Sequence, residues 1–192
     1  MTETDIILSV QDLDVKFDLR GRTLHAIRGV SLDVYRGESL AIVGESGSGK
    51  SVFTKSFMGL LDQNGYIAGG HILYGGQDLA GYASEKQWLT IRGREIAMVL
   101  QDPMTSLNPL KTIGRQIEEA VVLHQGLKGD AVRRAVLATL SDVGIDDPER
   151  RYGQYPHEFS GGMRQRVVIA IAVACRPKIL ICCLLYTSLD HQ

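Results

Sequence analysis

One glycine-rich segment has the residue types and spacing needed to hold a polyphosphate. Residues 44–51 read GESGSGKS and match the pattern G-x-x-x-x-G-K-[ST] at every position. Glycines let the backbone curl around an anion with its N–H groups inward, and a following helix offers its positive end. Lys50 would reach the β- and γ-phosphates, and the Ser51 hydroxyl would ligate Mg²⁺. The expected nucleotide site comprises Gly44, Glu45, Ser46, Gly47, Ser48, Gly49, Lys50 and Ser51.

The segments on either side of this loop give it a strand–loop–helix context. Ser39–Val43 is apolar and predicts a short strand buried in a parallel sheet, and a helix is expected from about Lys50 to Leu60. That context favours a phosphate loop over a simple glycine-rich turn. By itself, the loop leaves small-molecule kinases, GTPases and helicases open.

Two later segments place polar groups where α/β proteins present them to ligands. Gln101 directly follows a second apolar strand, about Glu95–Leu100, and so stands at a strand's carboxyl end. Residues 159–166 read FSGGMRQR and put Ser-Gly-Gly at a helix start, where Ser160 can cap and the amides can hold an anion. Gln101 could instead be an ordinary residue at a strand end, and Ser160 could be a plain N-cap without a ligand. Two glycines in a first turn weaken a helix, which indicates a further reason for them.

The hydrophobic pattern predicts an α/β fold with a parallel sheet as its core. Alternating apolar residues up to about Val34 indicate strands, and Gly65–Gly76 is expected to form short antiparallel pieces. Apolar residues at four-residue spacing indicate helices after residue 112, and Lys178–Cys182 is a third apolar strand. The block from about 103 to 159 is therefore a helical insertion into a core of alternating strands and helices.

Composition narrows the class of protein. The 192 residues contain 21 Lys and Arg against 22 Asp and Glu, so no basic field would attract nucleic acid. The longest apolar run, Val167–Cys175, is too short to span a bilayer. The N-terminus lacks the pattern of a secretion signal, and three clustered cysteines make no disulfide framework. We expect one cytoplasmic domain.

The ordered motifs together resemble the ATP-binding-cassette (ABC) family. GESGSGKS, Gln101 and SGGMRQR occur in that order, and the resemblance covers Leu8 to Ile181. The family's signature motif normally reads LSGGQ, and here Phe159 and Met163 replace its outer residues. QDPMTSLNP at 101–109 and YPHEFSGGMRQR at 155–166 resemble the ATP-binding subunits of di- and oligopeptide importers, a branch that includes nickel importers.

The resemblance implies cofactors, partners and residue roles. The cofactors would be ATP and Mg²⁺, and the fold a P-loop ATPase core with an N-terminal antiparallel β subdomain and a helical insertion. Gln101 would sense the γ-phosphate and Mg²⁺, while Ser160, Gly161 and Gly162 would contact ATP held on a second subunit in a head-to-tail dimer. Phe17 falls where an aromatic usually stacks on adenine, or is a strand-core residue. Permease subunits, and indirectly a solute-binding protein, would place the chain at the cytoplasmic face of the membrane.

The chain departs from the family where the hydrolytic residues should be. The family's strand commonly reads ILIADEPTTALD, whereas residues 179–190 read ILICCLLYTSLD. Without gaps, Cys183 replaces the Mg²⁺-associated Asp and Leu184 the Glu that polarises water. A thiol is a poor Mg²⁺ ligand, and leucine can neither accept a proton nor orient water. We expect a single, truncated ABC domain over 1–192 that binds ATP without appreciable hydrolysis.

Two accounts explain this departure. In one, the chain is a degenerate ATPase, because Leu189-Asp190 stands where the family has its D-loop. In the other, residues 183–192 are adapter-derived: the codons TGT CTC TTA TAC ACA TCT encode Cys183–Ser188 and match a transposon-end adapter used in sequencing libraries. We favour the adapter. Alternative functions are a catalytically inactive nucleotide-binding module and a non-transport ABC ATPase of translation or DNA repair.

Overall fold

The chain forms two compact units. The computed structural model describes residues 5–100 and 106–183, and contacts between Cα atoms divide the chain into unit 1, residues 1–88, and unit 2, residues 89–192.

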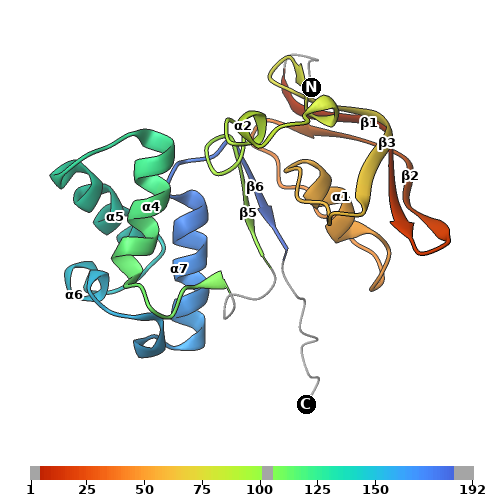
Figure 1. Cartoon of the computed structure of the whole chain (residues 1–192). Coiled ribbons are helices and arrows are strands. Elements are labelled where there is room, and N and C mark those ends of the chain that lie inside the picture. The colour runs from red at the N-terminus through yellow and green to blue at the C-terminus, as the bar shows by residue number, and fades with distance from the viewer. Residues whose placement is uncertain (1–4, 101–105, 184–192) are drawn as a thin grey trace. The chain divides into compact units, whose positions relative to one another are not determined.

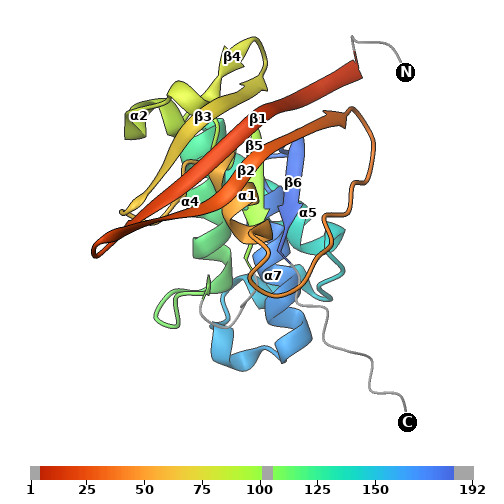
Figure 2. The same cartoon turned by 90° about the vertical axis from the view of Figure 1, so that its right-hand side faces the viewer.

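Unit 1 is built on an antiparallel sheet with strand order β2-β1-β3-β4 (Figures 1 and 2). Its strands are β1 (Ile6–Leu19), β2 (Arg22–Tyr35), β3 (Gly65–Tyr74) and β4 (Gln77–Asp78). Apolar side chains at alternating positions of β1 enter the core, as the period-two pattern predicts. The buried residues of β1 and β3 include Leu8, Val10, Leu13, Val15, Phe17, Ile72 and Tyr74. The predicted antiparallel subdomain is confirmed, although β3 is one strand rather than several short pieces.

The helices of unit 1 are short. They are α1 (Lys50–Ser56), the 3-10 turn η2 (Leu79–Gly81) and α2 (Glu85–Trp88). The predicted helix to Leu60 is too long, because α1 ends at Ser56 and residues 57–59 form a turn in which φ of Gly59 is +58°. A Cβ at Gly59 would lie 2.2 Å from the ring of Trp88. Only a glycine therefore allows the turn after α1 to approach this tryptophan.

The strand predicted at Ser39–Val43 is wrong for the described structure. These residues have no regular secondary structure, and the side chain of Val43 is 87% exposed. A short apolar segment becomes a strand only when a neighbouring strand supplies its hydrogen-bond partners. The local sequence predicts that the segment favours an extended strand, but it carries no information about the neighbouring strand.

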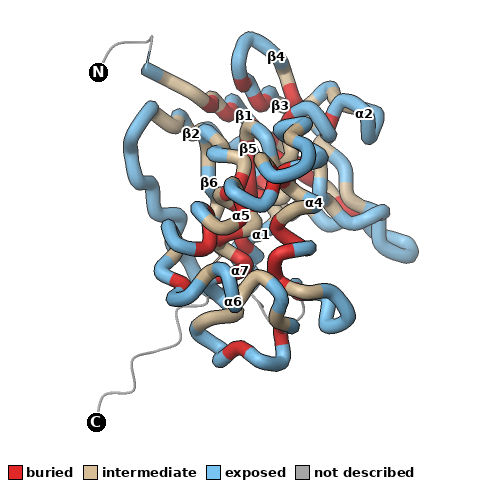
Figure 3. The backbone as a smooth tube through the Cα atoms, turned by 90° about the vertical axis from the view of Figure 1, so that its left-hand side faces the viewer, coloured by how far each residue is buried: buried red, intermediate tan, exposed pale blue. Residues whose placement is uncertain are grey.

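Unit 2 combines a parallel strand pair with a helical layer. Strands β5 (Ile96–Val99) and β6 (Ile179–Cys182) pair in parallel, which confirms the predicted parallel arrangement. The helices are α4 (Ile113–Gln125), α5 (Asp130–Asp142), α6 (Pro148–Tyr152), η3 (Pro156–Glu158) and α7 (Gly161–Val173). Their apolar faces form one core, in which the fully buried residues include Ile113, Ile117, Val121, Val136, Leu140 and Val167. Buried segments of these helices appear in red in Figure 3.

Candidate functional site

The glycine-rich loop of unit 1 wraps around the ammonium group of Lys50. The Nζ atom of Lys50 donates hydrogen bonds to the carbonyl oxygens of Gly44 at 2.6 Å and Glu45 at 2.7 Å, and to Oγ of Ser48 at 3.2 Å. Residues 44–48 are exposed, and Lys50 is the first residue of α1. The loop therefore presents one positive charge, fixed at its centre, to solvent.

Two glycines of the loop are required by the backbone. Gly47 and Gly49 have φ angles of +80° and +91°, in the left-handed region that other residues rarely adopt. A Cβ at Gly49 would lie 2.9 Å from Cδ1 of Ile27 in the neighbouring strand β2. The loop can thus approach the sheet only with glycine at this position.

The groups at the end of the loop suit a magnesium-bound polyphosphate. Ser51 is exposed in the first turn of α1, directly after Lys50. The ammonium group and the loop N–H groups can donate hydrogen bonds to phosphate oxygens. The hydroxyl oxygen of Ser51 is the kind of ligand that Mg²⁺ prefers. The residues present therefore fit the expected ligand, Mg²⁺–ATP.

The Ser-Gly-Gly segment of unit 2 caps helix α7 as predicted. Oγ of Ser160 accepts a hydrogen bond from the backbone N–H of Met163 at 3.3 Å. Gly161 and Gly162 occupy the first turn and are exposed. A Cβ added at either position would have no atom within 4 Å. Neither has a positive φ. Alanine at either position would favour the helix, so the described packing gives no reason for the glycines.

The β5–β6 pair of unit 2 places one further candidate residue, Cys183, at its carboxyl end. The backbone N–H of Cys183 donates to the carbonyl oxygen of Val99 at 2.9 Å, which places Cys183 at the carboxyl end of the β5–β6 pair. Burial raises the pKa of the neighbouring Cys182 thiol, and electrostatic interaction with Cys183 is a second, smaller cause of the rise. Cys183 thus occupies the sheet edge where the Mg²⁺-associated aspartate was expected. Gln101 and Leu184 lie outside the described residues.

Comparison with known proteins decides the family. A family model for the ABC transporter matches residues 27–182, which is most of the chain. The chain belongs to the ABC transporter family.

Curated relatives of this ABC chain include oligopeptide and dipeptide transport proteins. It is 55% identical to the oligopeptide transport ATP-binding protein AmiE of Streptococcus pneumoniae over 98% of the chain and 53% of AmiE. It is 52% and 47% identical to the dipeptide transport ATP-binding proteins DppD of Bacillus subtilis and Escherichia coli, over 96% of the chain and 55% and 56% of those proteins. The chain therefore spans about half the length of these relatives.

Solved ABC cassettes share the fold. The dimeric ATP-binding cassette MJ0796, in a post-hydrolysis state bound to ADP and Pi, matches with a TM-score of 0.77 and 26% identity over 91% of this chain and 72% of its own. The protein cbiO1 from Clostridium perfringens, part of the ABC transporter complex cbiONQ, matches with a TM-score of 0.74 and 29% identity over 93% of this chain and 65% of its own. The predicted α/β cassette fold is confirmed. Within the described ranges, no helix is long and apolar enough to cross a membrane.

Phe17 of this ABC chain has the packing role that the sequence left open. Its side chain is only 9% exposed, and a Cβ at Gly65 would lie 2.5 Å from its ring. An aromatic ring that stacks on adenine must offer an accessible face. Phe17 lies in the core of unit 1 in this structure, and adenine stacking by its ring stays a prediction.

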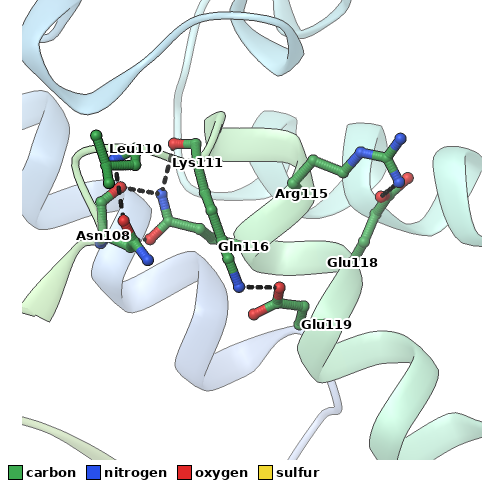
Figure 4. A network of polar contacts seen from close by, with 7 residues as sticks. All are labelled: Asn108, Leu110, Lys111, Arg115, Gln116, Glu118 and Glu119. Carbon is green, nitrogen blue, oxygen red and sulfur yellow. Dashed lines mark hydrogen bonds and ion pairs between the residues drawn. The ribbon is translucent and has the colours of Figure 1, made fainter.

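A buried glutamine braces the turn that follows the Gln101 segment. Gln116, on the first turns of α4, is 8% exposed and accepts a hydrogen bond from the N–H of Asn108 at 2.8 Å (Figure 4). Its amide donates to the carbonyl oxygens of Asn108 at 3.1 Å and Lys111 at 3.0 Å. No sequence motif singles out Gln116. The available signal is a polar side chain immediately before Ile117, inside the otherwise apolar stripe of α4.

Replacing Gln116 by leucine is expected to destabilise unit 2. The substitution keeps the volume similar but removes the partners of the Asn108 N–H and the Lys111 carbonyl oxygen, while the Asn108 carbonyl oxygen keeps the Lys111 N–H at 3.3 Å. We expect a cost of about 1–3 kcal/mol in the free energy of unfolding. Urea denaturation of the two proteins measures the difference. The matched control is Glu119→Gln, which removes only the exposed ion pair with Lys111 and should change stability by less than about 1 kcal/mol. Equal stability of Gln116→Leu and the control would contradict this assignment.

Proposed function

We propose that the chain is the ATP-binding part of a subunit that energises uptake of peptides through an ABC importer. The observation that carries the proposal is the ammonium group of Lys50 at the centre of an exposed glycine loop. The peptide transport proteins named above are about half identical to the chain, and this supports peptides as the transported class.

The residues of the loop perform the binding of ATP. The N–H groups of Gly44–Gly49 surround the phosphates, and Lys50 exchanges bonds to loop oxygens for bonds to the β- and γ-phosphates. Ser51 would supply a hydroxyl ligand to Mg²⁺, and Gln101 would supply an amide oxygen to it. Bound Mg²⁺ neutralises phosphate charge.

A second copy of the cassette completes the site. Ser160, Gly161 and Gly162 present N–H groups at the start of α7, and glycines keep this surface free of side chains. In a head-to-tail dimer, these groups meet the γ-phosphate bound by the partner subunit. ATP thereby holds two subunits together, and its loss lets them separate, which would move attached permease subunits at the cytoplasmic face of the membrane. A solute-binding protein would deliver the peptide.

The chain as given would bind ATP without efficient hydrolysis. Cys183 and Leu184 stand in place of the Mg²⁺-binding carboxylate and the catalytic base, which favours a non-catalytic nucleotide-binding module as the second candidate for this chain. We infer that residues 183–192 are adapter-derived and that the intact parent, whose single cassette domain includes residues 1–182, hydrolyses ATP. The chain spans about half the length of its relatives, which is consistent with a longer parent protein.

Peptide uptake by cells tests the proposal. The uninterrupted gene, expressed with the permease and solute-binding genes beside it, should confer ATP-dependent uptake of a labelled di- or tripeptide. Lys50→Ala should abolish uptake, because loss of the phosphate-binding ammonium removes ATP binding. Lys55→Ala, on the same helix, is the control and should retain uptake. Uptake that persists in Lys50→Ala, or uptake that is absent with every peptide tested, would contradict the proposal.

A further inference from the structure

An arginine of α6 lies against the residue that leads into the Ser-Gly-Gly segment. The Cζ atom of Arg151 lies 5.5 Å from the centroid of the Phe159 ring, within the range of a cation–π contact. Its Nη1 donates to Oε1 of Gln154 at 2.8 Å, which restrains the guanidinium over the ring. Its Nε is buried and has no hydrogen-bond partner among the described residues. Arg151 thus keeps a partly desolvated charge in contact with one aromatic side chain.

A second arginine holds the same residue at its backbone. Nε of Arg164 donates to the carbonyl oxygen of Phe159 at 2.9 Å. The Phe159 side chain is 2% exposed and packs in the core of unit 2. Phe159 is therefore fixed at its ring by Arg151 and at its carbonyl by Arg164, directly before Ser160.

The position of Phe159 matters because Gly161 and Gly162 have no side chains that could anchor the first turn of α7. The residue before an N-cap sets the angle at which the chain enters a helix, through the contacts of its side chain. Gly161 and Gly162 have no side chains, and a Cβ at either position would meet no atom within 4 Å outside the helix backbone, so no side-chain contact anchors them. Apart from the packing of α7 itself, the direction of the N–H groups at its start therefore depends on Ser160 and on Phe159 behind it.

We propose that Arg151 is a positioning residue for the anion-binding segment Ser160–Gly162, acting through the ring of Phe159. The assignment rests on the proposed function, in which this segment meets the nucleotide held by a partner subunit. A guanidinium suits the role because it is flat, can lie over a ring and can still donate to Gln154. A lysine would supply the positive charge, but it has no flat group to lie over the ring and no N–H placed to donate to Gln154 at the same time.

Hydrogen exchange of the chain, without nucleotide, tests the positioning directly. Arg151→Gln should raise exchange of the backbone N–H groups of Met163 and Arg164 by about threefold to tenfold, the range expected from loss of one cation–π contact. Exchange in α4 and α5 should stay unchanged. Arg151→Lys should give an intermediate rate. Arg150→Gln, on the exposed neighbour in the same helix, should match the wild-type chain.

Association of the subunits provides a second readout that a merely structural role would not move. With ATP present, sedimentation should show weaker self-association of Arg151→Gln, while its affinity for ATP in dilute solution should stay within about twofold of the wild type, since Lys50 is intact. Unchanged exchange at Met163 and Arg164, equal acceleration in α4 and α5, or the same effect in Arg150→Gln would overturn the assignment. If the wild-type chain binds ATP but does not associate, the head-to-tail dimer fails, and hydrogen exchange still decides the role of Arg151.

Discussion

The purified chain is expected to release no more phosphate from Mg²⁺–ATP than its own Lys50→Ala variant does. Hydrolysis in this fold needs a carboxylate on Mg²⁺ and a base that orients water, and Cys183 and Leu184 provide neither. Loss of a general base alone lowers a rate by about 10²–10⁴-fold. A coupled phosphate-release assay measures both proteins. Robust Mg²⁺-dependent hydrolysis that disappears in Lys50→Ala would contradict the prediction.

The origin of residues 183–188 has its own test at the DNA level. Amplification of the locus from source DNA is expected to replace the codons for Cys183 and Leu184 with codons for Asp and Glu, followed by the rest of the domain. Uninterrupted codons for Cys183–Ser188 would show that the segment is genuine. The chain would then be a degenerate cassette, and its inability to hydrolyse ATP would be a property of the protein.

Gly162→Ala is expected to make the protein more stable and its association weaker. A methyl group at Gly162 meets no atom within 4 Å and favours the helix, which should add about 0.5–1 kcal/mol to the free energy of unfolding. In the proposed dimer, the same methyl group lies where the partner's γ-phosphate must approach the helix. ATP-dependent self-association, measured by sedimentation, should therefore weaken by at least about tenfold, the factor that corresponds to roughly 1.4 kcal/mol.

The control for this prediction is a glycine in equally open space. Gly81 also has no neighbour within 4 Å of a Cβ position and has no positive φ, but lies in η2 of unit 1. Gly81→Ala should leave ATP-dependent association unchanged. A gain in stability with no loss of association in Gly162→Ala would show that these glycines do not meet a ligand on a second subunit.

Local motifs predicted the backbone geometry of the two candidate segments. The loop glycines at 47 and 49 have the backbone conformation that their motif requires, and Ser160 caps α7 through the expected hydroxyl contact. Both are interactions between residues close in sequence, so the pattern contains all the partners. The parallel pairing of β5 with β6 also followed, because alternating strands and helices leave few other arrangements.

The failures involve partners that are distant in sequence or that no pattern identifies. Ser39–Val43 has the composition of a buried strand, but strand formation depends on a neighbour that its own sequence does not specify. The sequence left Phe17 open between adenine and the core; its close approach to Gly65, far along the chain, shows that it packs in the core, and adenine stacking stays a prediction. Gln116 looks like an interruption of an apolar stripe until its three hydrogen bonds to the preceding turn are seen.

The central claim is that this chain binds ATP through Lys50. Isothermal titration of the purified chain with Mg²⁺–ATP tests it most directly, with Lys55→Ala as a matched control on the same helix. The wild-type chain and Lys55→Ala should bind one ATP with similar affinity. Lys50→Ala should bind at least about tenfold more weakly, because it loses charge-assisted hydrogen bonds to phosphate. The account would be contradicted by a folded wild-type chain that shows no saturable binding, or by equal affinity in Lys50→Ala.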